Sequence, residues 1–206
     1  MRGKKKSPER RYSYADYLKW DDQRRYEIID GLVYNMNAPL RVHQEVLLAA
    51  VRRLADFFDN RPCSVFIAPF DVRLATGKCA DDQIFNVVQP DISVVCDETK
   101  LDEKGCIGAP DLVVEVISPA TASRDHIQKR RLYESAGVRE YWLIDPTNRI
   151  VTLYCAGSDG NFRSPVTLGE TDILISETFA DLKIDLSAVF PARPQTLSEP
   201  APPAFE

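Results

Sequence analysis

The chain shows helical spacing of apolar residues over one long stretch and strand-like spacing over several short ones. From about 39 to 60 the apolar side chains fall near one stripe, which predicts an amphipathic helix. Residues 64–74 alternate between apolar and polar positions, as expected of a strand. Two strongly apolar runs follow at 87–96 and 111–117, each flanked by turn residues. Such runs are typical of strands at the centre of a sheet.

Turn and cap residues mark further elements on both sides of this central region. We expect Ser13 to cap a short helix, and Asp30-Gly31 between two apolar runs predicts a β-hairpin. A polar helix is predicted from about 123 to 136, with Gly137 as its C-terminal cap. Further strands are expected at 141–145, 149–154 and, closing the body, within 178–186.

The order strand, strand, helix, strand in the middle of the chain predicts an α/β core with a mixed sheet. A length of 206 residues suits one domain better than two. We expect that domain at 13–190, between a basic tail at 1–12 and a proline-rich tail at 191–206. The composition of both tails predicts disorder.

Composition adds little to this picture. An apolar content of 44% is ordinary for a globular protein, and no apolar run approaches the ~20 residues of a membrane span. No apolar segment follows the basic N-terminus, so we expect no secretory signal. The cysteines are odd in number and form no CxxC pair, which indicates reduced thiols in a cytoplasmic protein. They are Cys63, Cys79, Cys96, Cys106 and Cys155.

The formal net charge of −5 is unevenly distributed along the chain. Residues 1–11 hold six lysine or arginine side chains against Glu9 alone and so contribute +5. The acidic remainder argues weakly against nonspecific nucleic-acid binding, whereas a basic arm of this kind can contact phosphates. A solvated tail without such a role is the alternative interpretation.

Two carboxylates interrupt the apolar runs. Strand alternation places Val113, Glu115 and Ile117 on one face, and Asp91 has a similarly apolar setting. A buried carboxylate must be paired, protonated or bound to a metal, because burying its charge alone costs several kcal/mol. If the two strands are neighbours, the carboxylates can lie ~5 Å apart.

Two acids so close repel each other unless a cation lies between them. A hard divalent ion such as Mg²⁺ would fit oxygen ligands and could activate water for attack on phosphorus. The alternative is a structural ion pair of Glu115 or Asp91 with Lys129 or an arginine. Asp111 lies ~13 Å from Glu115 along an extended strand, so we expect it to begin the strand or cap a turn.

The polar helix that follows Glu115 carries the remaining candidates. Lys129 and Tyr133 are four residues apart and share a helical face, so a returning helix could direct Lys129 toward the carboxylates. There the lysine could hold water or stabilise developing negative charge. The alternative is an exposed basic helix. The residue pattern alone assigns no role to His43 in the long helix or to Glu27 in the hairpin.

These segments, taken in order, resemble the PD-(D/E)XK nuclease superfamily, and specifically the bacterial Uma-type putative restriction endonuclease family. The resemblance covers about residues 13–190. It rests on Tyr26-Glu-Ile-Ile-Asp-Gly, His43-Gln44, Gln89-Pro-Asp-Ile-Ser-Val-Val, Leu112-Val-Val-Glu-Val-Ile-Ser-Pro, Asp125 through Lys129 to Tyr133, and Gly137-Val-Arg-Glu-Tyr-Trp-Leu-Ile-Asp-Pro.

The resemblance implies a restriction-endonuclease-like fold, with a mixed central sheet flanked by helices. It implies that Asp91, Glu115 and the backbone carbonyl of Val116 bind Mg²⁺ or Mn²⁺. Glu27 resembles an additional acid of this fold, and His43 and Tyr133 are possible accessory residues. In the simplest superfamily motif a lysine follows the glutamate by two positions, where this chain has Ile117. The resemblance therefore implies that Lys129 replaces that lysine.

Three functions follow from these observations. The favoured one is an endonuclease that hydrolyses DNA with a divalent metal, through Asp91, Glu115, Lys129 and Glu27. The second is a nuclease-fold binding or assembly module without turnover, which the acidic body and the displaced lysine favour. The third, a structural protein with a buried ion pair, explains Glu115 but not the ordered set of motifs. DNA is the expected partner, and the fold makes a homodimer plausible.

Overall fold

The computed structural model describes residues 10–22, 24–75, 77 and 79–192. A six-stranded mixed sheet, here called the central sheet, has the strand order β12-β11-β10-β9-β6-β3. Strand β9 is parallel to β10, and the other neighbours in this sheet are antiparallel. Its strands are β3 (Ser64–Ile67), β6 (Ile92–Val95), β9 (Leu112–Val116), β10 (Glu140–Asp145), β11 (Ile150–Cys155) and β12 (Val166–Gly169).

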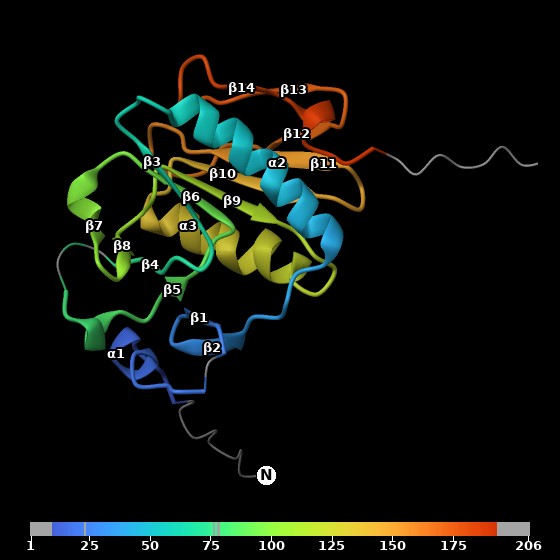
Figure 1. Cartoon of the computed structure of the whole chain (residues 1–206). Helices are drawn as coiled ribbons and strands as arrows, with labels where there is room; N and C mark the ends of the chain where they lie inside the picture. The colour runs from blue at the N-terminus through green and yellow to red at the C-terminus, as the bar shows by residue number, and fades with distance from the viewer. Residues whose placement is uncertain (1–9, 23, 76, 78, 193–206) are drawn as a thin grey trace, which may run out of the picture.

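A second sheet, also six-stranded, has the order β2-β1-β5-β4-β8-β7. It lies below the central sheet in Figure 1, next to the N-terminal helix. Its strands are β1 (Tyr26–Ile29), β2 (Leu32–Asn35), β4 (Val72–Arg73), β5 (Val87–Val88), β7 (Leu101–Asp102) and β8 (Gly105–Ile107). A two-stranded ribbon of β13 (Ile173–Ile175) and β14 (Lys183–Asp185) completes the β-structure of the described residues.

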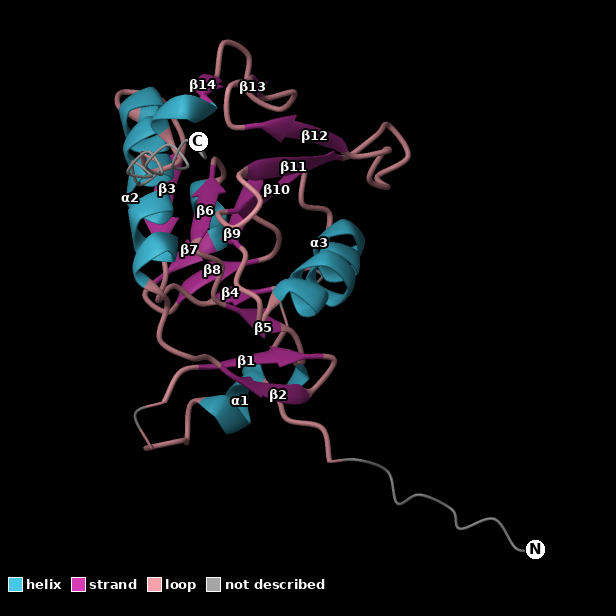
Figure 2. Cartoon of the chain, turned by 90° about the vertical axis from the view of Figure 1, so that its right-hand side faces the viewer, coloured by secondary structure: helices cyan, strands magenta, loops and turns pink. Residues whose placement is uncertain are grey.

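Helices cover both faces of the central sheet, as Figure 2 shows for α2 and α3. The helices of the described residues are α1 (Tyr14–Tyr17), α2 (Arg41–Phe58) and α3 (Arg130–Ala136), with a π-helical turn η3 (Arg124–Lys129) directly before α3 and short 3-10 turns η1 (Asp81–Gln83), η2 (Glu98–Lys100) and η4 (Leu186–Ala188). The apolar stripe of α2 packs on one face of the central sheet, against side chains such as Val114 and Val116. Leu132 and Tyr133 of α3 pack on the other face, together with residues of the second sheet.

Local sequence signals explain several of these elements. Ser13 caps α1 in a reciprocal capping box with Asp16, which satisfies two backbone N–H groups at the start of the helix. Asp30 and Gly31 both have positive φ angles, 52° and 81°, as the tight turn of the β1–β2 hairpin requires. Gly137 ends α3 in the left-handed conformation. The predicted α/β fold with a mixed central sheet flanked by helices is confirmed.

Two predicted strands are each divided between the two sheets. The run 64–74 forms β3 in the central sheet and β4 in the second, with Pro69 between them. The run 87–96 likewise forms β5 and β6 on either side of Pro90. Proline cannot donate to a strand ladder, so it suits such a crossing point. The two crossings are adjacent, because the Ala68 N–H donates to the Asp91 carbonyl at 3.2 Å.

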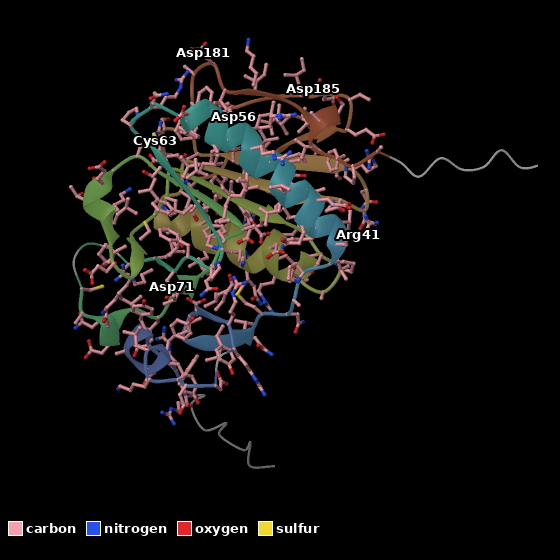
Figure 3. The ribbon with its side chains drawn as sticks, in the orientation of Figure 1. Arg41, Asp56, Cys63, Asp71, Asp181 and Asp185 are labelled. Carbon is pink, nitrogen blue, oxygen red and sulfur yellow. A yellow bond between two sulfur atoms is a disulfide. The ribbon has the colours of Figure 1, made fainter. Side chains whose placement is uncertain are left out.

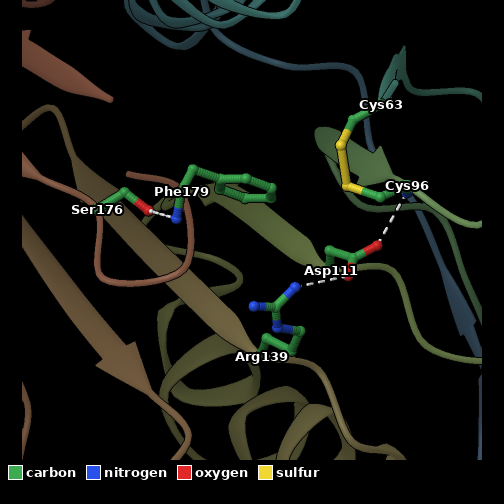
Figure 4. The surroundings of a disulfide bond; sticks show 6 residues. All are labelled: Cys63, Cys96, Asp111, Arg139, Ser176 and Phe179. Atoms are coloured by element: carbon green, nitrogen blue, oxygen red, sulfur yellow. Dashed lines mark hydrogen bonds and ion pairs between the residues drawn. A yellow bond between two sulfur atoms is a disulfide. The ribbon is translucent and has the colours of Figure 1, made fainter. Parts of the chain in front are cut away.

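The expectation of five reduced thiols is wrong for one pair, since Cys63 and Cys96 form a disulfide (Figure 4). The physical reason is the antiparallel pairing of β3 with β6, which joins Ser64 to Val95 and so sets the two cysteines opposite each other. Sequence spacing could not show this pairing. Such bonds are rare in a reducing cytoplasm. Cys79, Cys106 and Cys155 are free.

The two tails fall almost entirely outside the described residues, at 1–9 and 193–206. The predicted disorder of those segments stays a prediction. In the described part of the chain, no helix combines the length and apolar character that a membrane crossing needs.

Replacing both Cys63 and Cys96 by serine should lower the free energy of unfolding under oxidising conditions. The bond closes a ring over a separation of 33 residues. In the chain-entropy account, a ring of this size contributes about 3–4 kcal/mol. Urea denaturation with and without reductant measures the effect. Cys79→Ser should behave like the wild type, and a wild-type midpoint that does not respond to reductant would contradict the expectation.

Candidate active site

Glu115 is a buried acid in the middle of β9. The strand pairs with β10 on one side and β6 on the other, and the Glu115 side chain lies on the face toward α3. Its exposure is only 5%. The Lys129 ammonium and the Tyr133 hydroxyl each donate to Glu115 Oε1 at 2.8 Å. The helix that returns across the sheet therefore places both predicted side chains on this acid.

Lys129 joins acids from three separate elements. Its Nζ lies 2.7 Å from Glu27 Oε1 on β1, 2.8 Å from Glu115 Oε1 on β9 and 3.8 Å from Asp125 Oδ1 in η3. All four side chains are nearly inaccessible to solvent. The ion pair considered as the alternative for Glu115 is thus present, in a larger form than a simple pair.

Asp91 lies at the crossing between β5 and β6 and belongs to a different set of contacts. Its Oδ2 accepts a hydrogen bond from the Val116 N–H at 2.8 Å, and its Oδ1 lies 3.2 Å from His43 Nε2 on α2. The structure thus brings His43 and Val116 to Asp91, with Val116 contacting it through the backbone N–H. Asp111 is elsewhere, where it accepts from the Cys96 N–H and pairs with Arg139 (Figure 4).

These two groups of side chains line one pocket of about 410 Å³. The wall includes Asp91, Val116 and His43 from one group and Glu27, Glu115, Asp125 and Lys129 from the other. Tyr133 lies behind Glu115 and supports it without lining the pocket. The catalytic and metal-binding candidates of the sequence therefore meet at one place, between the two sheets and the N-terminal end of α2.

Sequence reasoning missed Gln89, which connects the pocket wall to the second sheet. Its backbone N–H donates to Glu27 Oε1 at 3.1 Å, and its Nε2 donates to Asp71 Oδ1 at 2.8 Å. Asp71, labelled in Figure 3, also accepts from the Tyr14 hydroxyl. Gln89 is 4% exposed. The available sequence signal was a polar residue inside an apolar run, directly before Pro90-Asp91.

Two arginines of the pocket were also missed, Arg25 and Arg124. Arg124 stacks over the Tyr34 ring, with 4.3 Å between its guanidinium carbon and the ring centroid. Arg25 donates through Nε to Gln89 Oε1 at 2.8 Å. Neither arginine carries a local sequence signal, because the residue that each contacts is distant along the chain: Tyr34 for Arg124 and Gln89 for Arg25.

Burial and neighbouring charges shift the titration of this cluster. Burial alone would lower the pKa of Lys129, but Glu115, Glu27 and Asp125 outweigh it and raise that pKa above its ordinary value. Burial raises the pKa of Glu115 well above its ordinary value; Lys129 opposes this, while Asp125, Asp91 and Glu27 add to it. Burial likewise raises the pKa of Asp125. One ammonium serves several acids, which favours its protonated state, while burial and the neighbouring acids oppose ionisation of Glu115 and Asp125.

The donor set fits a hydrated divalent ion better than a closed metal cage. Within the described ranges, no three His, Cys, Asp or Glu side chains form a ready-made metal-binding group. Mg²⁺, however, is usually bound by one or two carboxylates and keeps several waters. Asp91 and Glu115 supply two carboxylates at one pocket wall. The residues present therefore suit the ion that the resemblance implies.

Fold and comparisons together define the class of this protein as a nuclease. The sequence profile of the Uma2 family, described as "Putative restriction endonuclease", matches residues 14–187. The chain therefore belongs to the Uma2 family.

Two individual proteins are similar to this chain over most of its length. A protein of Synechocystis sp., named as uncharacterized, is 27% identical over 159 residues, which are 76% of this chain and 80% of that protein. A crystal structure from Anabaena variabilis, described as a putative nuclease of the domain family DUF820, has a TM-score of 0.68 at 19% identity. The match covers 86% of this chain and 97% of that one, and it shows the shared fold.

Lys129→Met should destabilise the protein strongly at neutral pH. It leaves buried carboxylates without their ammonium, a loss that typically costs about 3–5 kcal/mol. The pKa values of Glu115 and Asp125 are higher in the folded state than in the unfolded chain. As the pH falls toward the ordinary pKa of a carboxyl group, the folded state therefore binds more protons than the unfolded chain, and lower pH favours folding. The variant should therefore regain stability as the pH is lowered from 8 to 5.

Chemical denaturation across this pH range measures the effect. Lys183→Met on exposed β14 is the matched control and should follow the wild type. A Lys129→Met variant with wild-type stability at pH 8 would contradict the assignment of this lysine as the counter-charge of the cluster.

Proposed function

We propose that this protein is an endonuclease that hydrolyses phosphodiester bonds of DNA with the help of Mg²⁺, for which Mn²⁺ can substitute. The observation that carries the proposal is the charge balance of the pocket. Its wall holds four carboxylates and three cationic side chains, and burial and the neighbouring acids together oppose ionisation of Glu115. A divalent cation would change the formal net charge of these side chains from negative to positive. A singly charged phosphodiester would then bring that net charge to zero.

Asp91 and Glu115 are the proposed ligands, together with the backbone carbonyl of Val116. The bound ion would supply Lewis-acid activation of water and of the phosphoryl oxygen. His43 and the Val116 N–H fix the Asp91 carboxylate from opposite oxygens, and Tyr133 fixes Glu115. These contacts restrict both carboxylates to orientations set by the protein, so that little reorganisation is needed when substrate binds.

Lys129 acts as a fixed positive charge in this proposal. Its raised pKa keeps it protonated near neutral pH, so it cannot remove a proton from water. An ammonium at this place can donate hydrogen bonds to the attacking water or to the phosphate as negative charge develops. Glu27 holds the ammonium from the side of the second sheet and could assist a second ion.

The alternative is a nuclease-fold module that binds nucleic acid or a partner without turnover. The specific observation in its favour is that Glu115 Oε1 already accepts from both Lys129 and Tyr133. An ion would then have to share this carboxylate with a lysine. The proposal further includes action as a homodimer, because two copies of one site can cut two strands during one binding event.

Asp91→Ala and Lys129→Ala should each reduce cleavage of plasmid DNA in Mg²⁺ or Mn²⁺ by about 100-fold or more. This is the typical effect of removing one group that stabilises the transition state. Lys129→Ala is assayed under conditions in which circular dichroism shows that it is folded, because loss of this ammonium also destabilises the protein. Asp56→Ala, on the exposed side of α2, is the matched control and should cut like the wild type. Equal cutting by all three variants would point to a contaminating nuclease and overturn the proposal.

Mn²⁺ should raise the unfolding temperature of the wild type but not that of Asp91→Ala. A ligand that binds only the folded state adds about 2.7 kcal/mol of stability at 100 times its Kd. Thermal melts and calorimetric titration detect the ion without any cleavage. Identical responses of Asp91→Ala and wild type would show that the ion does not bind at Asp91.

A further inference from the structure

Arg25 has an unusual hydrogen-bond inventory for a side chain in the wall of the pocket. It lies directly before β1, two residues ahead of Glu27. Its Nε donates to Gln89 Oε1 at 2.8 Å. Its Nη2 is buried and has no hydrogen-bond acceptor among the described residues. A buried N–H donor of a charged group without an acceptor is costly, so its persistence calls for an explanation.

The neighbouring acids Glu27 and Asp71 bond to other donors and not to Arg25. Glu27 accepts from Lys129 and from the Gln89 N–H. Asp71 accepts from Tyr14 and from the Gln89 side chain. The guanidinium thus keeps a buried donor unused on the wall of the pocket that also holds Asp91 and Glu115.

Gln89 fixes the direction of this guanidinium. Its side-chain oxygen binds Arg25, its side-chain nitrogen binds Asp71 and contacts the Tyr17 hydroxyl at 3.3 Å, and its backbone binds Glu27. Because Glu27 in turn holds Lys129, one glutamine sets both Arg25 and an acid of the active site. An arginine held in this way loses little side-chain freedom when a ligand arrives.

We propose that Arg25 binds a non-bridging phosphate oxygen of the nucleic acid in this pocket. The inference rests on the proposed function and names the group that recognises the substrate backbone. A guanidinium suits an anionic phosphate because its N–H donors make charge-assisted hydrogen bonds in a fixed plane. Arg124, stacked on Tyr34, lines the same pocket and supplies a second positive charge for the same strand.

The test uses the full chain and a short fluorescein-labelled DNA duplex, with Ca²⁺ in place of Mg²⁺ to prevent cleavage. Fluorescence anisotropy gives the affinity of wild type, Arg25→Met and the control Arg24→Met over a range of salt concentrations. Arg24 is exposed and adjacent in sequence. We expect Arg25→Met to bind about tenfold or more weakly, with a salt dependence reduced by about one counterion, while Arg24→Met binds like the wild type.

Thermal unfolding shows whether Arg25→Met is folded in the binding assay. Arg25→Met removes an unpaired donor but also the bond to Gln89 Oε1, so it should lower the unfolding temperature moderately whether or not Arg25 binds DNA. A variant that is no longer folded at the assay temperature, or one with a DNA affinity and salt dependence equal to those of the wild type, would overturn the assignment of Arg25. Arg25→Lys keeps the charge but loses the planar fork, so it should recover only part of the affinity.

Parallel cleavage assays in Mg²⁺ distinguish this inference from the function on which it rests. Wild-type cleavage with unchanged binding by Arg25→Met overturns the role of Arg25 and leaves the nuclease proposal standing. Binding that depends on Arg25 without any wild-type cleavage supports the phosphate contact and favours a binding module. If the wild type shows neither DNA binding nor cleavage, both proposals are overturned.

Discussion

The ammonium of Lys129 is the interaction on which the arrangement of the site depends. It reaches Glu27 from the second sheet, Glu115 from the central sheet and Asp125 from its own helical turn. Burying several carboxylates together is strongly unfavourable without a counter-charge. One lysine therefore allows the two sheets and η3 to converge on a single point, where three carboxylates share one ammonium. A simple structural ion pair would join one acid to one base.

The chain crossings between the sheets explain why Asp91 faces this cluster. Both long apolar runs switch sheets at a proline, and the crossing at Pro90 places Gln89 and Asp91 on opposite sides of the switch. Gln89 enters the hydrogen-bond network of the second sheet, whereas Asp91 binds the backbone of β9 at Val116. A segment of three residues thus contributes to both groups of side chains in the pocket. The π-helical turn has a corresponding role on the other side, because it presents Asp125 and Lys129 inward together.

The sequence was sufficient for features that depend on local periodicity. Glu115 was visible as a charge in an apolar strand, and the Lys129–Tyr133 spacing predicted one inward helical face. Contacts between distant segments were not visible: the second sheet, the Cys63–Cys96 bond and the positions of Arg25 and Gln89 all depend on strand pairing. A buried acid is also ambiguous by itself. Glu140 is fully buried in β10, yet the Trp142 indole, the Ser176 hydroxyl and the Thr178 N–H satisfy it without any charged partner.

The position of Lys129 on the helical turn, and not on strand β9, determines which groups surround its ammonium. At the position two residues after Glu115, Ile117 packs in the core between the central sheet and α3. A lysine arriving from η3 instead approaches Glu115 from the side of the second sheet, where Glu27 also binds it. This extra acid helps to keep the ammonium protonated, because burial would otherwise favour the neutral amine. The geometry therefore favours the protonated state of Lys129 in the folded protein.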